Sequence, residues 1–177
     1  MLGAKTINTM ADTTDRGVAC ANLYPHVRDT LLRSHPWNCC IKRKQIAPNA
    51  DAPLYDYSYS YNLPSDWLKT LSVGEYGGEV DFKTEGRKIL CNESSLLLRY
   101  VFRNEDVSTW DTSLVEAMTI AMAERLSYAI TSSASMQANM AQKLQMTLKR
   151  ARAEDGQDDP SETLGDFRLL AARRSRL

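Results

Sequence analysis

The feature that most constrains the fold is an alternation of tyrosine with small polar residues at positions 55–62. Tyr55, Tyr57, Tyr59 and Tyr61 recur at every second position. An extended strand turns successive side chains to opposite faces, so the four tyrosines would share one face. The strand must end before Pro64, which cannot donate to a ladder. The pattern favours a half-buried sheet face over the other interpretation, a tyrosine-lined ligand surface.

Other extended segments surround this stripe. Residues 41–47 carry Lys42, Arg43 and Lys44 and read as a short basic strand, more typical of a solvated sheet edge than of a phosphate clamp. Residues 96–102 place apolar side chains on both faces, which is typical of a central strand. The further segments are residues 67–73, 80–83 and 87–91, with a tight turn at Glu85-Gly86. These spacings predict an antiparallel β-meander lobe of about five strands, within residues 40–103.

Apolar residues at helical spacing predict three helices, at about 12–35, 112–131 and 134–153. Pro25 either kinks the first helix or begins a second one. The third carries methionine and leucine at every fourth position, more typical of a core or helix interface than of a cofactor box. Together these elements predict an α+β fold, in which residues 1–153 form one domain of helical bundle and sheet lobe. Residues 154–177 form a C-terminal extension. It begins with the acidic sequence EDGQDDP (154–160), which is predicted to break the helix and is called the acidic breaker.

Composition narrows the class of protein. The charges of the 22 basic and 22 acidic side chains cancel. A net charge of zero disfavours a protein whose main function is to bind nucleic acid, because phosphate binding needs an excess of cations. No apolar run approaches the roughly twenty residues needed to cross a bilayer, and no signal peptide is recognised, so we expect no membrane partner. The four cysteines lack the spacing of a disulfide framework. They are interpreted as reduced thiols of a protein made in a cytosol.

The chain carries no recognisable catalytic motif. A phosphate loop, a dinucleotide glycine fingerprint and a nucleophile elbow are all missing from the sequence. His26, His35, Cys39 and Cys40 have no finger-like ligand spacing, so we expect no metal and no cofactor. The glycine loop at 74–78 has neither a nucleophile nor a base beside it. We therefore expect that the protein is not an enzyme.

A set of short segments, in consistent order, resembles the tail tubular protein A family, the head–tail adaptors of short-tailed bacteriophages. The segments are MLGA (1–4) with Ile7, LYPHVRD (23–29), LRSHPW (32–37), YSYNLPSDWL (59–68), EGRKIL (85–90), LRYV (98–101), EA (116–117), AERL (123–126) and IT (130–131). They extend over most of residues 1–152. Members of the family usually have a further helix before the Leu-Gly step at positions 2–3. Residues 154–177 match nothing in the family.

The resemblance implies a structural virion protein at the head–tail interface, made in the host cytoplasm. Family members form a ring of identical subunits, typically twelve, beneath the portal protein. The ring receives the tail nozzle or tail tube protein, and DNA passes through its channel without sequence-specific binding. The balanced charge is consistent with such a conduit. An alternative function is a small nucleic-acid-binding module that uses Lys42, Arg43, Lys44 and Tyr59.

The C-terminal extension is predicted to bind a partner. So short a segment buries too little surface to stay ordered alone, and its apolar side chains would remain exposed to water unless a partner covered them. The predicted partner is the portal or a neighbouring subunit. The predicted partner-binding residues are Leu164, Phe167, Leu169, Leu170, Arg173, Arg174 and Arg176. Ring contacts are expected on the exposed sides of helices 112–130 and 135–152 and at the sheet edge near Lys42, because a head-to-tail ring needs two different complementary surfaces.

Overall fold

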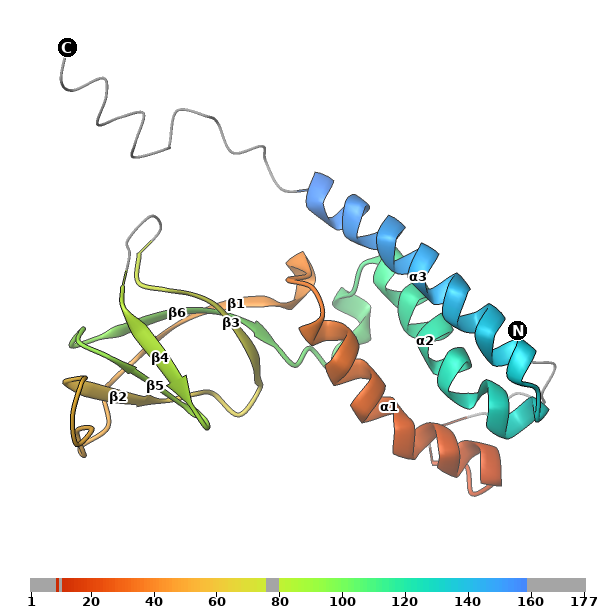
Figure 1. Cartoon of the computed structure of the whole chain (residues 1–177), viewed down its shortest axis with the longest axis horizontal. Helices are drawn as coiled ribbons and strands as arrows, with labels where there is room; N and C mark the ends of the chain where they lie inside the picture. Colours follow the sequence, from red (N-terminus) through yellow and green to blue (C-terminus); the bar gives the residue numbers. More distant parts are fainter. Residues whose placement is uncertain (1–8, 10, 76–79, 159–177) are drawn as a thin grey trace, which may run out of the picture.

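The computed structural model describes residues 9, 11–75 and 80–158 and places them in a helical lobe and a β lobe (Figure 1). The helical lobe contains α1 (Asp15–Arg33), α2 (Thr112–Thr131) and α3 (Ala134–Gln157). The described part of the β lobe contains β1 (Ile41–Ile46), β2 (Tyr59–Asn62), β3 (Trp67–Val73), β4 (Phe82–Glu85), β5 (Lys88–Cys91) and β6 (Leu96–Phe102). Two short 3-10 turns, η1 (Asn38–Cys40) and η2 (Val107–Thr109), lie on the connections between the lobes. The predicted α+β class is confirmed.

The strands form two antiparallel sheets of three, in the orders β1-β6-β3 and β2-β5-β4. The prediction of one meander of about five strands is therefore wrong in its order. β6, the last strand, returns to lie between β1 and β3 because it is apolar on both faces and needs cover on each. Its predicted central position is confirmed, as is the tight turn at Glu85-Gly86, where Gly86 adopts a positive φ of 58°.

Two hydrophobic cores share β6. Leu96, Leu98 and Tyr100 are buried between the two sheets, in the core of the β lobe. Val101, on the opposite face of the same strand, is fully buried among residues of the helices, together with Leu68 of β3. The alternation of a strand thus sends neighbouring side chains into different cores and fixes one lobe to the other.

The tyrosine stripe is shorter than predicted. β2 begins at Tyr59, and Asp56 has a left-handed φ of 69°, which breaks the extended conformation before that point. Tyr61 is fully buried in the β core, whereas Tyr55 is 76% exposed. Ser60, on the face opposite to the tyrosines, is also buried. Its Oγ donates a hydrogen bond to the Asp51 carbonyl, 3.1 Å away in the loop that covers this residue.

α1 starts where its cap predicts and continues through Pro25. The side chain of Thr14 accepts a hydrogen bond from Gly17 N, and Pro25 lies inside the helix. Arg28 of α1 is only 8% exposed, although arginine is rarely buried without a partner. Its guanidinium lies 2.9 Å from the carboxylate of Asp29 and 3.1 Å from that of Glu105, which offsets the cost of burying the charge.

α2 has the predicted bounds, whereas α3 is longer than predicted. α2 ends at Ser132, whose left-handed conformation stops the helix. α3 then packs along α2 and continues past residue 153 to Gln157, through the predicted acidic breaker. Asp155 accounts for the difference: it is 5% exposed and its Oδ1 accepts a hydrogen bond from Asn38 N at 2.9 Å. The extension boundary predicted at 154 therefore moves to the end of this helix.

The contacts of Asp155 connect the end of α3 to the entrance of the β lobe. Asn38 Nδ2 donates to the Asp155 carbonyl at 2.8 Å, and His35 Nε2 lies 3.0 Å from Asp155 Oδ2. Trp37, between these two residues, is fully buried in the helical core. Its indole Nε1 donates to the Leu31 carbonyl at 3.2 Å.

Replacement of Asp155 should destabilise the subunit. Asp155→Ala removes the acceptors of Asn38 N and His35 Nε2 in a buried place, and we expect the free energy of unfolding to fall by about 1–3 kcal/mol. Urea denaturation followed by circular dichroism measures this loss. The control is Glu154→Ala, whose half-exposed carboxylate forms a 3.6 Å pair with Arg150 and should cost at most about 0.5 kcal/mol. Equal effects of the two substitutions would contradict the assigned role of Asp155.

Candidate assembly surfaces

The partner-binding residues predicted in the extension lie outside the described residues. These are Leu164, Phe167, Leu169, Leu170, Arg173, Arg174 and Arg176. The described chain ends at Asp158, directly after α3. The surfaces that the structure does place are the outer faces of the helices, the edge of β1 and a pocket beside that edge.

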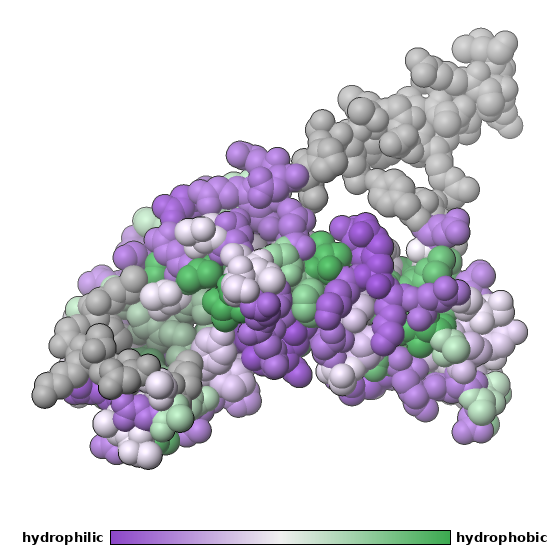
Figure 2. All heavy atoms as spheres, turned by 180° about the vertical axis from the view of Figure 1, so that it is seen from behind, coloured by the Kyte–Doolittle hydropathy of each residue, from purple (hydrophilic) through white to green (hydrophobic). Residues whose placement is uncertain are grey.

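The helices present two different outer faces. α2 lies between α1 and α3, so most of it is buried, and it keeps a narrow exposed stripe that includes Val115 (37% exposed) and Tyr128 (57%). The outer face of α3 is broad and mostly polar, with Met146 (64% exposed) as its large apolar side chain. In Figure 2, apolar side chains reach the surface in separate places with polar ones between them. These two faces are chemically unlike, as a head-to-tail contact requires.

At the β1 edge of the sheet, the Lys42 side chain is not free to bind a partner, contrary to what the sequence suggested, because it already has contacts within the subunit. Lys42 Nζ lies 3.0 Å from Asp66 Oδ2 and 3.7 Å from the ring centre of Phe102. The Tyr100 hydroxyl donates to the other Asp66 oxygen at 3.1 Å. Burial alone would raise the pKa of Asp66, but these two donors outweigh it and lower the pKa below its ordinary value. Burial, with the Asp66 charge, raises the pKa of Tyr100 to about 12. The charge of Lys42 is therefore already paired.

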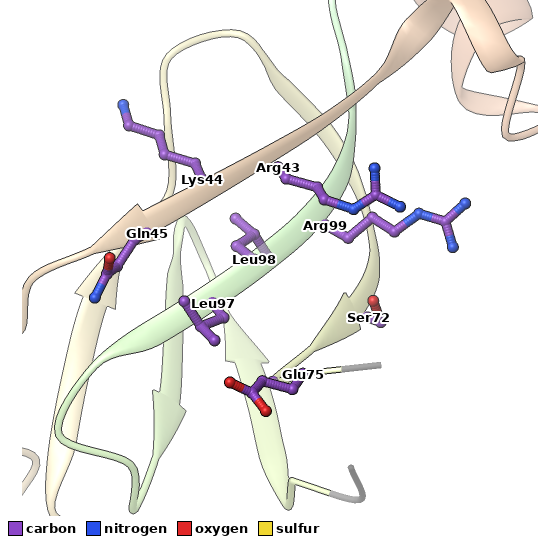
Figure 3. A pocket seen from close by; sticks show the side chains of 9 residues that line it. Arg43, Lys44, Gln45, Ser72, Glu75, Leu97, Leu98 and Arg99 are labelled. Atoms are coloured by element: carbon purple, nitrogen blue, oxygen red, sulfur yellow. The ribbon is translucent and has the colours of Figure 1, made fainter. Parts of the chain in front are cut away.

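A pocket opens on the other face of the sheet that contains β1. Arg43 of β1 and Arg99 of β6 are direct cross-strand partners, and Figure 3 shows their side chains extending together in one direction. The hollow has a volume of about 370 Å³ and also contains Leu97, Ser72 and Glu75. We call this hollow the arginine pocket. Its remaining lining residues are Lys44, Gln45, Gly74 and Leu98.

The residues proposed for nucleic-acid binding do not share one surface. Lys42 and Lys44 are two apart on β1 and lie on the face opposite to Arg43, as strand alternation requires. Tyr59 belongs to the other sheet and packs against the β core. The four side chains therefore form no continuous basic groove with an exposed aromatic ring, the arrangement that a single-strand-binding surface uses.

The histidines and three of the cysteines lie in the helical lobe or at its junction with the β lobe, whereas Cys91 lies on β5 and is buried in the β core. His26 is exposed on α1, whereas His35 contacts Asp155 after the end of that helix. Within the described ranges, no group of three histidine, cysteine or acidic side chains has the geometry to hold a metal ion. Nor does any described helix combine the length and apolarity needed to cross a membrane.

Cys39 and Cys40 form a pair of thiols that share a hydrogen bond. Their Sγ atoms are 3.6 Å apart. The hydrogen bond from the Cys40 thiol lowers the pKa of Cys39 to about 7, against the opposing effect of burial. The same interaction and burial raise the pKa of Cys40. Cys39 is thus the nucleophilic member of the pair and Cys40 the proton donor.

Comparison with known proteins adds no relative. No family model matches the chain, and no curated protein matches it either.

The arginine pocket is the feature that sequence reasoning missed. In the sequence, Arg43 is one of three neighbouring cations, and Arg99 is a single arginine in an otherwise apolar strand, so neither residue indicates a pocket. They meet because the pairing of β1 with β6 places residue 43 opposite residue 99. A register between strands so far apart in the sequence leaves no local signal. The correct strand order was needed to find it.

The thiol pair makes the reactivity of Cys39 depend on pH. Alkylation by iodoacetamide should rise from pH 6 to pH 8 with a midpoint near 7, because only the thiolate reacts. In Cys40→Ala the hydrogen bond is lost, so the midpoint should move up toward that of an ordinary thiol. Mass spectrometry of the labelled peptide gives both curves. A wild-type midpoint above 8.5, unchanged in Cys40→Ala, would contradict the assignment.

Proposed function

We propose that the protein is a structural virion component, a ring-forming adaptor that joins the phage capsid to its tail and has no catalytic activity. The observation that carries the proposal is the ordered series of segments that resembles the tail tubular protein A family. These segments fall in both lobes, on α1, on β2, β5 and β6, and on α2. A resemblance distributed over both lobes concerns the whole fold and not one shared motif.

The two outer helix faces support assembly of identical subunits. A closed ring forms when one surface of a subunit fits a different surface of the next. The stripe of α2 offers apolar side chains such as Tyr128, and the face of α3 offers Met146 surrounded by polar residues. In the proposed ring, which has twelve subunits in the family, these faces meet between neighbours. The charge balance of the chain, 22 cations and 22 anions, suits a channel that must release DNA and not hold it.

The proposed partners follow from that position in the virion. The portal protein lies on one side of the ring, and the tail nozzle or tail tube protein on the other. DNA crosses the channel during packaging and ejection without sequence-specific contacts. Among this chain's own residues, the apolar and basic side chains in the second half of the extension, such as Leu170 and Arg173, are proposed to contact the portal or a neighbouring subunit.

Electron microscopy of the purified protein, alone and mixed with its portal protein, tests the ring. We expect annular particles of one diameter. In Tyr128→Arg the rings should be lost while circular dichroism of the subunit stays unchanged, because this side chain is 57% exposed and its new charge falls in the subunit contact. The matched control is Tyr55→Arg, at a tyrosine that is 76% exposed in the β lobe, which should still form rings. A protein that stays monomeric even with its portal would refute the proposal.

Deletion of the extension tests its part in docking. Removal of residues 159–177 should leave the subunit folded, because the helices and strands between residues 15 and 157 already bury two hydrophobic cores among themselves. Binding to the portal, measured by co-sedimentation, should weaken by about tenfold or more, since a segment with several apolar side chains is lost. A large fall in the melting temperature of the isolated subunit would instead place these residues in its core.

A further inference from the structure

The arginine pocket contains two positively charged side chains, Arg43 and Arg99, on neighbouring strands. Arg43 and Arg99 face each other across β1 and β6, which brings their Cβ atoms to about 5 Å. Like charges in this position destabilise a strand pair. Neither guanidinium lies within 4.0 Å of a carboxylate of the described residues. Among the described residues, the pocket is therefore short of negative charge.

One nitrogen in the pocket has no partner among the described residues. Arg99 Nε is buried and has no hydrogen-bond acceptor in the described part of the chain. A buried donor without an acceptor costs about 1–3 kcal/mol. Glu75, the one acidic side chain among the described lining residues, enters from the opposite side of the hollow in Figure 3. A carboxylate placed between Arg43 and Arg99 would relieve the repulsion between the two guanidinium groups.

The other lining residues of the arginine pocket indicate which chemical group should lie next to the carboxylate of a bound ligand. Leu97 lies two residues before Arg99, on the same face of β6, and forms an apolar wall beside the two arginines. A free small anion would leave this wall exposed to water, whereas an apolar side chain next to a carboxylate would cover it. The complementary ligand is thus a peptide with an acidic residue and a large apolar residue side by side.

The end of α3 lies close enough to supply such a peptide from the same chain. Asp155 is hydrogen-bonded to Asn38, five residues before Arg43. Five residues span at most about 17 Å. Asp166 lies eight residues after Asp158, the last described residue, and eight extended residues reach about 27 Å. The chain beyond α3 is therefore long enough to bring Asp166 to the pocket.

The sequence of the extension has the required chemistry in its first half. Asp166 is followed by Phe167, and Glu162 lies two residues before Leu164. The second half is unsuitable, because the arginines from position 173 onward would be repelled by the pocket. Charge complementarity thus separates the extension into an acidic half that fits the arginine pocket and a basic half left for another partner.

We propose that residues 162–167 of the chain dock in the arginine pocket of the same subunit, with the carboxylate of Asp166 or Glu162 between Arg43 and Arg99. Phe167 or Leu164 covers the apolar wall. This contact concerns the single subunit and is independent of the proposed ring. It holds the first half of the extension against the β lobe.

Cross-linking of the full chain tests the contact. Arg43→Lys keeps the positive charge and supplies an amine, which a zero-length carbodiimide couples to an adjacent carboxylate. At micromolar protein, mass spectrometry of the monomeric product should show position 43 joined to Glu162 or Asp166. Arg87→Lys, an exposed position of the other sheet, is the control and should give no such link. A product joined to neither residue, a control with equal yield, or a link found only in dimers would overturn the proposal.

Trypsin cleavage after Arg168 gives a second, independent readout. Docking should slow this cleavage in the full chain, and the paired substitutions Glu162→Gln and Asp166→Asn should speed it by about fivefold, as expected for loss of an ion pair worth about 1 kcal/mol. Arg99→Gln should have the same effect, and 1 M salt should reduce the difference. Equal cleavage rates in all three proteins would overturn the proposal. Loss of rings in the experiment above would leave this result unaffected.

Discussion

The structure depends on the double burial of β6. Leu96, Leu98 and Tyr100 of this strand are held between the sheets, while Val101, on its other face, is held among the helices. Each fully buried side chain of this size contributes about 1.5–3 kcal/mol. Neither lobe can move away without exposing its share of the strand. Asp155 adds a polar tie at the same junction, between the end of α3 and the residues that lead into β1. The two lobes therefore act as one rigid unit, which suits a part whose proposed task is geometric.

Local patterns in the sequence predicted those elements whose signal is contained within them. The bounds of α2 follow from its apolar spacing and from the Thr131–Ser133 break, and the central position of β6 follows from its apolar residues on both faces. Most of the errors arose where distant residues decide. Asp155 was assigned to a breaker because its partner, Asn38, is far away in the sequence. One error has a local cause: the tyrosine alternation was predicted to begin at Tyr55, but Asp56 adopts a left-handed conformation, which an aspartate tolerates at modest cost.

The same limit applies to the candidate surfaces. Exposed helix faces were predictable from periodicity, because side chains off the apolar stripe remain on the outside. The arginine pocket was not, since it exists only once β6 is paired with β1. It also changes the interpretation of the extension, from one segment awaiting a single partner to two halves of opposite charge. The first half matches a surface of its own subunit, and the second remains available to the proposed assembly.

The central claim is that the protein works by assembling into a closed ring. Native mass spectrometry of the full chain with its portal protein tests this claim most directly, because it counts subunits. The account predicts one discrete complex in which this component is present as a fixed whole-number multiple, near twelve, of the 19.9 kDa chain. A ladder of sizes without a preferred multiple, or the 19.9 kDa chain alone at every portal concentration, would contradict it.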